Sequence, residues 1–204
     1  LPSLFLKYQP EDWLILRYAN TKTLTRPNYS DIIPLYNISG AARAVEYRNP
    51  YLEPGVSKNN DYVVSFNNKH LGLLSFSYFS KKIEGLIFSS GQRYITDPSL
   101  YGLPGYAEKY RINDYKANNP YIVTLDGFEI DYQTRFWYLP KLLRGLVFNA
   151  NYTRTDSEVK YPRTVIETKV IFDPSFQVVT LNLDSLYVDR LLDQPRDIVN
   201  LSLG

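Results

Sequence analysis

Two acidic side chains are the first candidates for chemistry in this sequence. Glu129 and Asp131 lie two residues apart, so in an extended strand they project from the same face. Glycoside hydrolases use a pair of carboxylates, and this spacing therefore has to be weighed as a catalytic pair. The surrounding segment 127–136 alternates strictly between apolar and polar residues, which explains both acids without catalysis. We interpret them as ordinary members of a polar strand face.

Nucleophilic and metal-dependent chemistry finds few suitable residues. The sequence has no cysteine and a single histidine, His70, which lies in a predicted tight turn without a second histidine at ligand spacing. It contains no phosphate-binding loop, dinucleotide fingerprint or Gly-x-Ser-x-Gly elbow. We therefore expect a protein that is not an enzyme, with no catalytic residue, no cofactor and no bound metal.

Composition excludes two further classes of protein. The formal net charge of the 204 residues is +2, which is too small for a nucleic-acid-binding domain, so we expect no nucleic-acid partner. The apolar runs are far shorter than the roughly 18–20 residues that a transmembrane helix needs.

The chain is rich in tyrosine, with 19 residues, and such amphipathic rings suit strands, interfaces and membrane boundaries.

The elements that must position these side chains are strands. Period-two alternation predicts about six of them, over 13–25, 61–68, 73–90, 119–138, 145–156 and 198–204. The connections at 69–72 and 139–145 are short. The other three connections are long and contain many Pro, Gly, Asn, Asp and Tyr residues, and they cover 26–59, 91–118 and 157–190.

Each predicted strand has an apolar and a polar face. The apolar set, expected to face lipid, is Leu14, Leu16, Phe76, Phe128, Ile130, Tyr132, Phe148 and Leu201. The polar set, expected to face a wet lumen, is Arg17, Glu129, Asp131, Gln133, Arg135, Asn149 and Asn151.

Two all-β architectures are compatible with this alternation. A soluble sandwich buries its apolar face between two sheets, whereas an outer-membrane barrel turns that face to lipid. Short turns at one end and long loops at the other are typical of the barrel. Segment 119–138 is also long for a sandwich strand, whose usual length is about 5–6 residues. The residues favour an antiparallel up-and-down meander in a large transmembrane β-barrel, with short periplasmic turns and long extracellular loops. In such a meander the three long loops must share one end.

The segment 94–110 is the most aromatic of these loops. It carries Tyr94, Tyr101, Tyr106 and Tyr110 beside acidic and basic residues. Flat rings next to polar groups can stack on sugars or aromatic chelators, although a self-packed loop has the same composition. These four tyrosines are the candidate substrate-binding residues.

Several segments resemble a known family. TKTLTRPNYSD at 21–31, RNPYLEPGVSKNND at 48–61 and GFEIDY at 127–132 resemble, in order and spacing, segments of the barrels of TonB-dependent outer-membrane receptors. The segments LPKLLRGL at 139–146, NYTRTD at 151–156 and LDQPRDIVNLSL at 192–203 continue the same order, so the resemblance covers about 11–204.

The resemblance implies that 1–204 is part of a receptor barrel domain, lacking the plug and the terminal strands. It implies import of a scarce, bulky nutrient (siderophore, glycan, peptide or vitamin) across the Gram-negative outer membrane. The implied partners are outer-membrane lipid and the TonB energy-transducing complex, contacted through the absent plug, with room for a surface lipoprotein. The alternatives are a soluble all-β carbohydrate-binding module or a barrel partner in a larger envelope complex.

Overall fold

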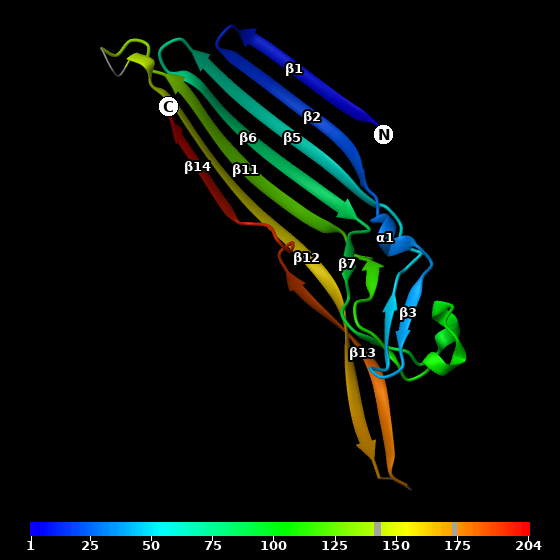
Figure 1. Cartoon of the computed structure of the whole chain (residues 1–204). Coiled ribbons are helices and arrows are strands. Elements are labelled where there is room, and N and C mark those ends of the chain that lie inside the picture. The colour runs from blue at the N-terminus through cyan, green and yellow to red at the C-terminus, as the bar shows by residue number, and fades with distance from the viewer. Residues whose placement is uncertain (141–143, 173–174) are drawn as a thin grey trace.

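One antiparallel sheet of eight strands forms most of the molecule (Figure 1). The computed structural model describes residues 1–140, 144–172 and 175–204. The strands of this sheet are β1 (Ser3–Glu11), β2 (Leu14–Thr25), β5 (Gly55–Asn68), β6 (Gly72–Glu84), β11 (Val123–Arg135), β12 (Val147–Ile171), β13 (Gln177–Asp189) and β14 (Asp197–Leu203). Their order is β1-β2-β5-β6-β11-β12-β13, and β14 also pairs with β12. The predicted up-and-down meander is therefore confirmed.

The strand register explains why these segments pair. Apolar residues lie opposite one another on successive strands, and one row runs through Leu16, Val64, Phe76, Ile130 and Tyr152. Because side chains alternate across a strand, a slip of one residue would mix this row with polar neighbours, so the pattern fixes the register.

The apolar face has no second sheet against it in the described part of the chain. Phe76 is 42% exposed, Phe128 40% and Leu201 70%. A soluble sandwich would bury these side chains. This exposure contradicts the sandwich alternative and agrees with a face made for lipid.

The first strand and the last long connection differ from the sequence prediction. β1 was not predicted, although Leu4, Leu6 and Tyr8 alternate with polar residues and pair with β2. The prediction of a loop over 157–190 is wrong, because β12 continues to Ile171 and pairs with β13 over thirteen positions. Pro162 and the many charged residues favoured a loop in the sequence prediction. In the structure, β12 and β13 form backbone hydrogen bonds with each other, so both segments are strands. Residues 141–143 of the predicted turn 139–145, and residues 173–174, lie outside the described residues.

The two remaining long connections are folded. The first contains α1 (Tyr29–Ile32), β3 (Tyr36–Ser39) and β4 (Ala44–Tyr47). The second, between β6 and β11, contains β7 (Ile87–Ser89), β8 (Arg93–Tyr94), the 3₁₀ helices η1 (Pro98–Tyr101) and η2 (Gly105–Ala107), β9 (Arg111–Ile112) and β10 (Lys116–Asn118). A four-stranded sheet in the order β3-β4-β9-β8 joins the two connections.

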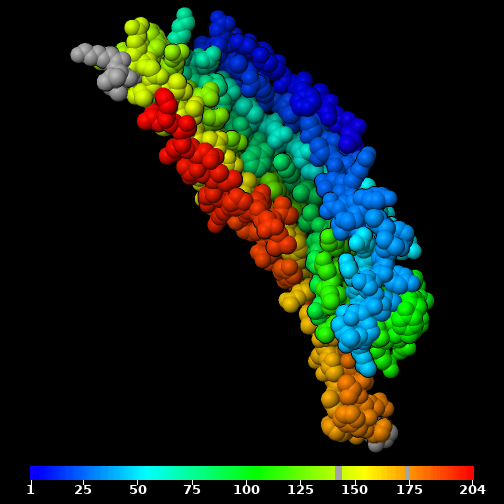
Figure 2. Space-filling view, in the orientation of Figure 1, coloured from blue at the N-terminus to red at the C-terminus, as the bar shows by residue number. Residues whose placement is uncertain are grey.

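The long connections share one end of the main sheet, as the meander predicts. The turn at 69–71, the connection from β11 to β12 and the turn between β1 and β2 lie at the other end. Figure 1 shows both folded connections beside the lower part of β12, where it pairs with β13, and Figure 2 shows the β12–β13 hairpin projecting beyond them.

Candidate ligand-binding face at the loop end

A small apolar core holds the two folded connections together. Val45 from the first connection is fully buried against Ile95, Leu103, Ala107 and Ile112 from the second. The parallel pairing of β4 with β9 aligns the backbones that carry Val45 and Ile112. The loop end therefore has a core of its own, separate from the strand faces.

The turn that begins η1 is built by Asp97. Its carboxylate accepts hydrogen bonds from the backbone N–H of Ser99 (2.9 Å) and the Ser99 hydroxyl (2.6 Å). Pro98 follows at the first helical position and Gly102 ends the helix with a φ of 63°. The two bonds from Ser99 stabilise the charged carboxylate and lower the pKa of Asp97.

Two of the four predicted tyrosines are packed into this core. The Tyr101 ring meets Tyr47 edge-on at 5.6 Å and Tyr115 at 6.1 Å between centroids. Burial raises the pKa of Tyr101, and burial together with the neighbouring tyrosines raises the pKa of Tyr47 to about 12. Tyr110 also lies against the buried cluster. Both predicted residues therefore have a packing role in this loop.

The other two predicted tyrosines are accessible but separate. Tyr106 in η2 is 68% exposed, and Tyr94 lies half-buried in β8 against the β12–β13 hairpin. The structure does not gather the four rings into one site. A role for Tyr94 or Tyr106 in ligand contact stays a prediction.

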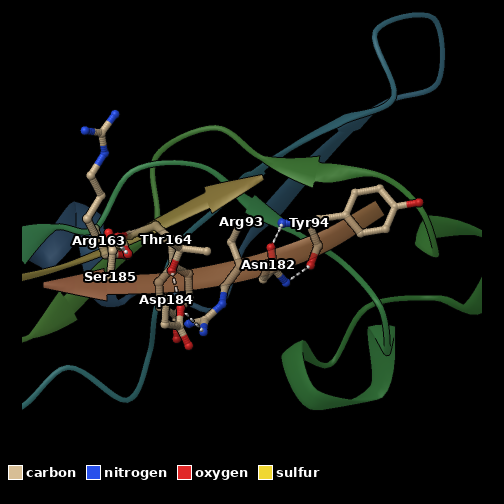
Figure 3. Close-up of polar contacts among 9 residues, drawn as sticks. Arg93, Tyr94, Arg163, Thr164, Asn182, Asp184 and Ser185 are labelled. Atoms are coloured by element: carbon tan, nitrogen blue, oxygen red, sulfur yellow. Dashed lines mark hydrogen bonds and ion pairs between the residues drawn. The ribbon is translucent and has the colours of Figure 1, made fainter. Parts of the chain in front are cut away.

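The β12–β13 hairpin is fastened to β8 by polar contacts (Figure 3). The side-chain amide of Asn182 donates to the Tyr94 carbonyl and accepts from the Tyr94 N–H, both at 2.8 Å. Arg93 lies 3.8 Å from the Asp184 carboxylate, which also accepts a 2.9 Å hydrogen bond from the Thr164 hydroxyl. These contacts place the hairpin beside the two connections.

Two cavities of about 500 Å³ open at this end. The first surrounds the ion pair between Lys116 and Asp31, whose nitrogen and oxygen are 2.9 Å apart. The second lies between the loop sheet and the hairpin, and Arg43, Lys109 and Arg111 line it together with Tyr94. Sequence reasoning singled out neither Arg43 nor Arg111. The one available signal was Lys109 inside the tyrosine-rich segment.

The predicted faces of the main sheet can be checked against the register. All eight residues of the apolar set fall on one face and all seven of the polar set on the other. On the polar face the Asn151 amide donates to Glu129, and the Ser75 hydroxyl donates to Ser65 at 2.9 Å. That this polar face lines a lumen stays a prediction.

Membrane-spanning helices and clusters of metal-binding side chains are both absent from the described residues. No helix in that part of the chain is long and apolar enough to cross a membrane. It also holds no cluster of three or more His, Cys, Asp or Glu side chains suited to a metal ion.

Known proteins resemble this chain at the level of family and fold. The family described as "TonB dependent receptor-like, beta-barrel" matches residues 1–204. No curated protein shows a significant sequence match. The crystal structure of the siderophore receptor PirA from Pseudomonas aeruginosa superposes with a TM-score of 0.53 at 14% identity, over 95% of this chain. The chain spans 36% of the length of PirA. The chain belongs to the TonB-dependent receptor-like β-barrel family, whose members lie in the outer membrane of Gram-negative cells.

Proposed function

We propose that this chain forms wall, lumenal face and outer loops of a transporter that imports a scarce, bulky nutrient across the outer membrane. The observation that carries the proposal is the asymmetry of the sheet. One face is apolar and uncovered, the other is polar, and the long connections gather at one end. That combination is typical of a transmembrane barrel with a polar interior and long outer loops.

An aromatic row supports the assignment of the apolar face to lipid. Tyr18, Tyr62, Tyr78 and Phe128 lie opposite one another on four neighbouring strands. The centroids of Tyr18 and Tyr62 are 5.0 Å apart, and those of Tyr62 and Tyr78 are 6.3 Å apart. Barrels carry such girdles where the hydrocarbon meets water, because a tyrosine ring is apolar and its hydroxyl is polar. We place the outer membrane boundary at this row.

The polar face is proposed to line the lumen and to meet a plug. Such a barrel closes only with more strands than these, and large family barrels have about 22. We place those strands, and the plug through which TonB would supply energy, outside these 204 residues. The contacts of Glu129 and Asn151 would then belong to the inner wall.

The substrate class is proposed from the loop end rather than from the wall. PirA is described as a siderophore receptor, which makes a ferric siderophore the first candidate to test. A glycan, a peptide or a vitamin would use the same route. Selectivity would reside in the folded connections, because they occupy the end that faces outward.

The test uses the full-length receptor in its own cells. Residues 94–110 are replaced by a short Gly-Ser turn, which removes η1, η2 and much of the loop core but none of the wall strands. We expect heat-modifiable barrel assembly to persist while uptake of radiolabelled ferric siderophores or fluorescent glycans falls at least about tenfold. Uptake by the unmodified receptor should also stop when the proton gradient is collapsed or TonB is deleted. Uptake that ignores both treatments would overturn energised import. If the variant with the Gly-Ser turn takes up substrate as the unmodified receptor does, residues 94–110 have only a packing role.

A further inference from the structure

Three cationic side chains from both folded connections meet at one cavity. Arg43 precedes β4, Lys109 precedes β9 and Arg111 begins β9, and all three line the cavity of about 500 Å³ against the hairpin. The backbone N–H of Arg111 donates to the carbonyl of Arg43 at 3.0 Å, so the parallel pairing of β4 and β9 itself places these two residues side by side.

The backbone at this cavity is held in an unusual conformation. Arg43 has a φ of 46° and Lys109 a φ of 65°, and both are left-handed positions that ordinarily favour glycine. Each such residue is strained, because its Cβ lies close to the following carbonyl oxygen. The contacts around them must offset this strain, and local strain of this kind concentrates at functional sites.

The three cations have no ion-pair partner among the residues that the structure describes. Two carboxylates on the hairpin already pair with other cations. Glu167 pairs with Lys169 at 3.5 Å, and Asp184 pairs with Arg93 at 3.8 Å. The lining includes no acidic side chain, whereas Tyr94 and Ile166 provide rings and methyl groups. The cavity therefore presents uncompensated positive charge beside a small apolar wall.

We propose that this cavity binds a soluble anionic ligand with several carboxylate or phosphate groups. The inference rests on the proposed function, since it names a substrate class for the same outer loops. Arg43 and Arg111 would bind the anionic groups through paired N–H donors, and Lys109 would add a third charge. Tyr94 and Ile166 would contact the apolar part of the ligand.

The position of the cavity favours a soluble ligand over a lipid headgroup. Ile166 lies twelve residues beyond Arg154 on β12, and Arg154 pairs with Phe128 in the aromatic row. At about 3.3 Å per residue, the cavity is about 40 Å along the strand from the proposed membrane boundary. Membrane phosphates lie near that boundary.

The test is calorimetric titration of the purified full-length receptor with citrate and with pyrophosphate. We expect each probe to bind and its affinity to fall as salt is raised, because the contacts are charged. The substitutions Arg43→Gln, Lys109→Gln and Arg111→Gln should each weaken binding about threefold, and all three together at least about tenfold. Arg43→Lys, which keeps the charge but not the paired N–H donors, should restore only part of the loss caused by Arg43→Gln.

The matched control is Arg163→Gln on the same hairpin. Arg163 is exposed and does not line the cavity, and Figure 3 shows its side chain pointing away from Arg93 and Tyr94. Its replacement should change the affinity less than about twofold. Vesicles of phosphatidylglycerol should not compete with citrate, and competition would assign the cavity to lipid instead.

The proposal is overturned if neither probe binds, if the triple variant binds as the unmodified receptor does, or if Arg163→Gln loses as much. If the triple variant fails to assemble, the single variants decide. Anion binding without TonB-dependent uptake would refute the proposed transport function and leave the site intact. TonB-dependent uptake, combined with anion binding that the triple variant leaves unchanged, would refute the anion site and leave the proposed transport function intact.

Discussion

The side-chain amide of Asn182 forms two hydrogen bonds with the backbone of Tyr94, as the backbone of a neighbouring strand would. Its amide nitrogen donates to the Tyr94 carbonyl and its oxygen accepts from the Tyr94 N–H, each at 2.8 Å. A single side chain thus satisfies both backbone polar groups of one residue at the edge of the loop sheet. Because Asn182 belongs to the projecting hairpin and Tyr94 to the connection after β6, this pair joins two segments 88 residues apart.

Replacing Asn182 with leucine should destabilise the contact between the hairpin and β8 without affecting the strands of the main sheet. Each lost hydrogen bond is worth about 1 kcal/mol, so the free energy of opening at Tyr94 should fall by about 2 kcal/mol. Hydrogen exchange at the Tyr94 amide would then accelerate by about 10- to 30-fold. Mass spectrometry of the full-length receptor can measure this rate in the peptide that contains Tyr94.

Gln177→Leu serves as the matched control, because Gln177 is an exposed amide on the same strand. It should leave the exchange of Tyr94 unchanged. Equal exchange in the unmodified receptor and in Asn182→Leu would show that the junction does not depend on Asn182.

Gly127 should tolerate no side chain. A Cβ built there would overlap the Phe79 ring and would lie 2.6 Å from the carbonyl oxygen of Arg154, which is backbone and cannot rotate away. We expect Gly127→Ala to destabilise the barrel by about 1–3 kcal/mol, measured as a lower urea midpoint of the heat-modifiable form. Gly105→Ala, with nothing within 4 Å of its Cβ, should leave the midpoint in place. Identical midpoints for the two variants would contradict this account.

The wall was predictable because its signal is local. Phe128, Ile130 and Tyr132 alternate with acidic and amide neighbours, and that alternation determines the strand, its two faces and the register together. Turn length then determined which connections share an end. These inferences need no knowledge of any distant residue.

The loop end was not predictable because its contacts are non-local. Arg43 and Arg111 meet only through the parallel pairing of two short strands, and neither strand has a periodic pattern. Tyr101 was a predicted ligand contact because the sequence of a polar loop does not show whether a tyrosine ring is packed against the protein or exposed. Similarly, Pro162 argued against a strand over this part of β12. The strand forms because β13, which is distant from Pro162 in the sequence, pairs with it.

Two adjacent residues on β11 distinguish lipid from lumen. Ile130 belongs to the apolar face and Asp131 to the polar face. Ile130→Lys would place a charge in hydrocarbon two residues inside the proposed boundary at Phe128, at a cost between the about 0–1 kcal/mol of the interface and the about 2–4 kcal/mol of the bilayer midplane. We expect the yield of heat-modifiable barrel in outer-membrane fractions to fall for this variant. Asp131→Lys places the same side chain on the next position and should assemble normally. Equal assembly of both variants would refute the assignment of the faces.

Alkaline pH should act on the loop core through Tyr47. Burial, then the nearby Tyr115, Tyr51 and Tyr101, raise the pKa of Tyr47 from 10.0 to about 12. A raised folded pKa means that the neutral phenol contributes stability that is complete below pH 10 and is lost as the pH rises through about 12.

The measurement is the tyrosinate absorbance of the full-length receptor minus that of Tyr47→Phe, titrated upward from pH 8. This difference is dominated by the phenol that the variant lacks, because the tyrosines that do not contact Tyr47 cancel between the two proteins. We expect its midpoint near 12 in the folded receptor and near 10 after unfolding in urea. The same difference midpoint before and after unfolding would show that the Tyr47 phenol is solvated. The aromatic core of Tyr47, Tyr101 and Tyr115 would then not exclude water.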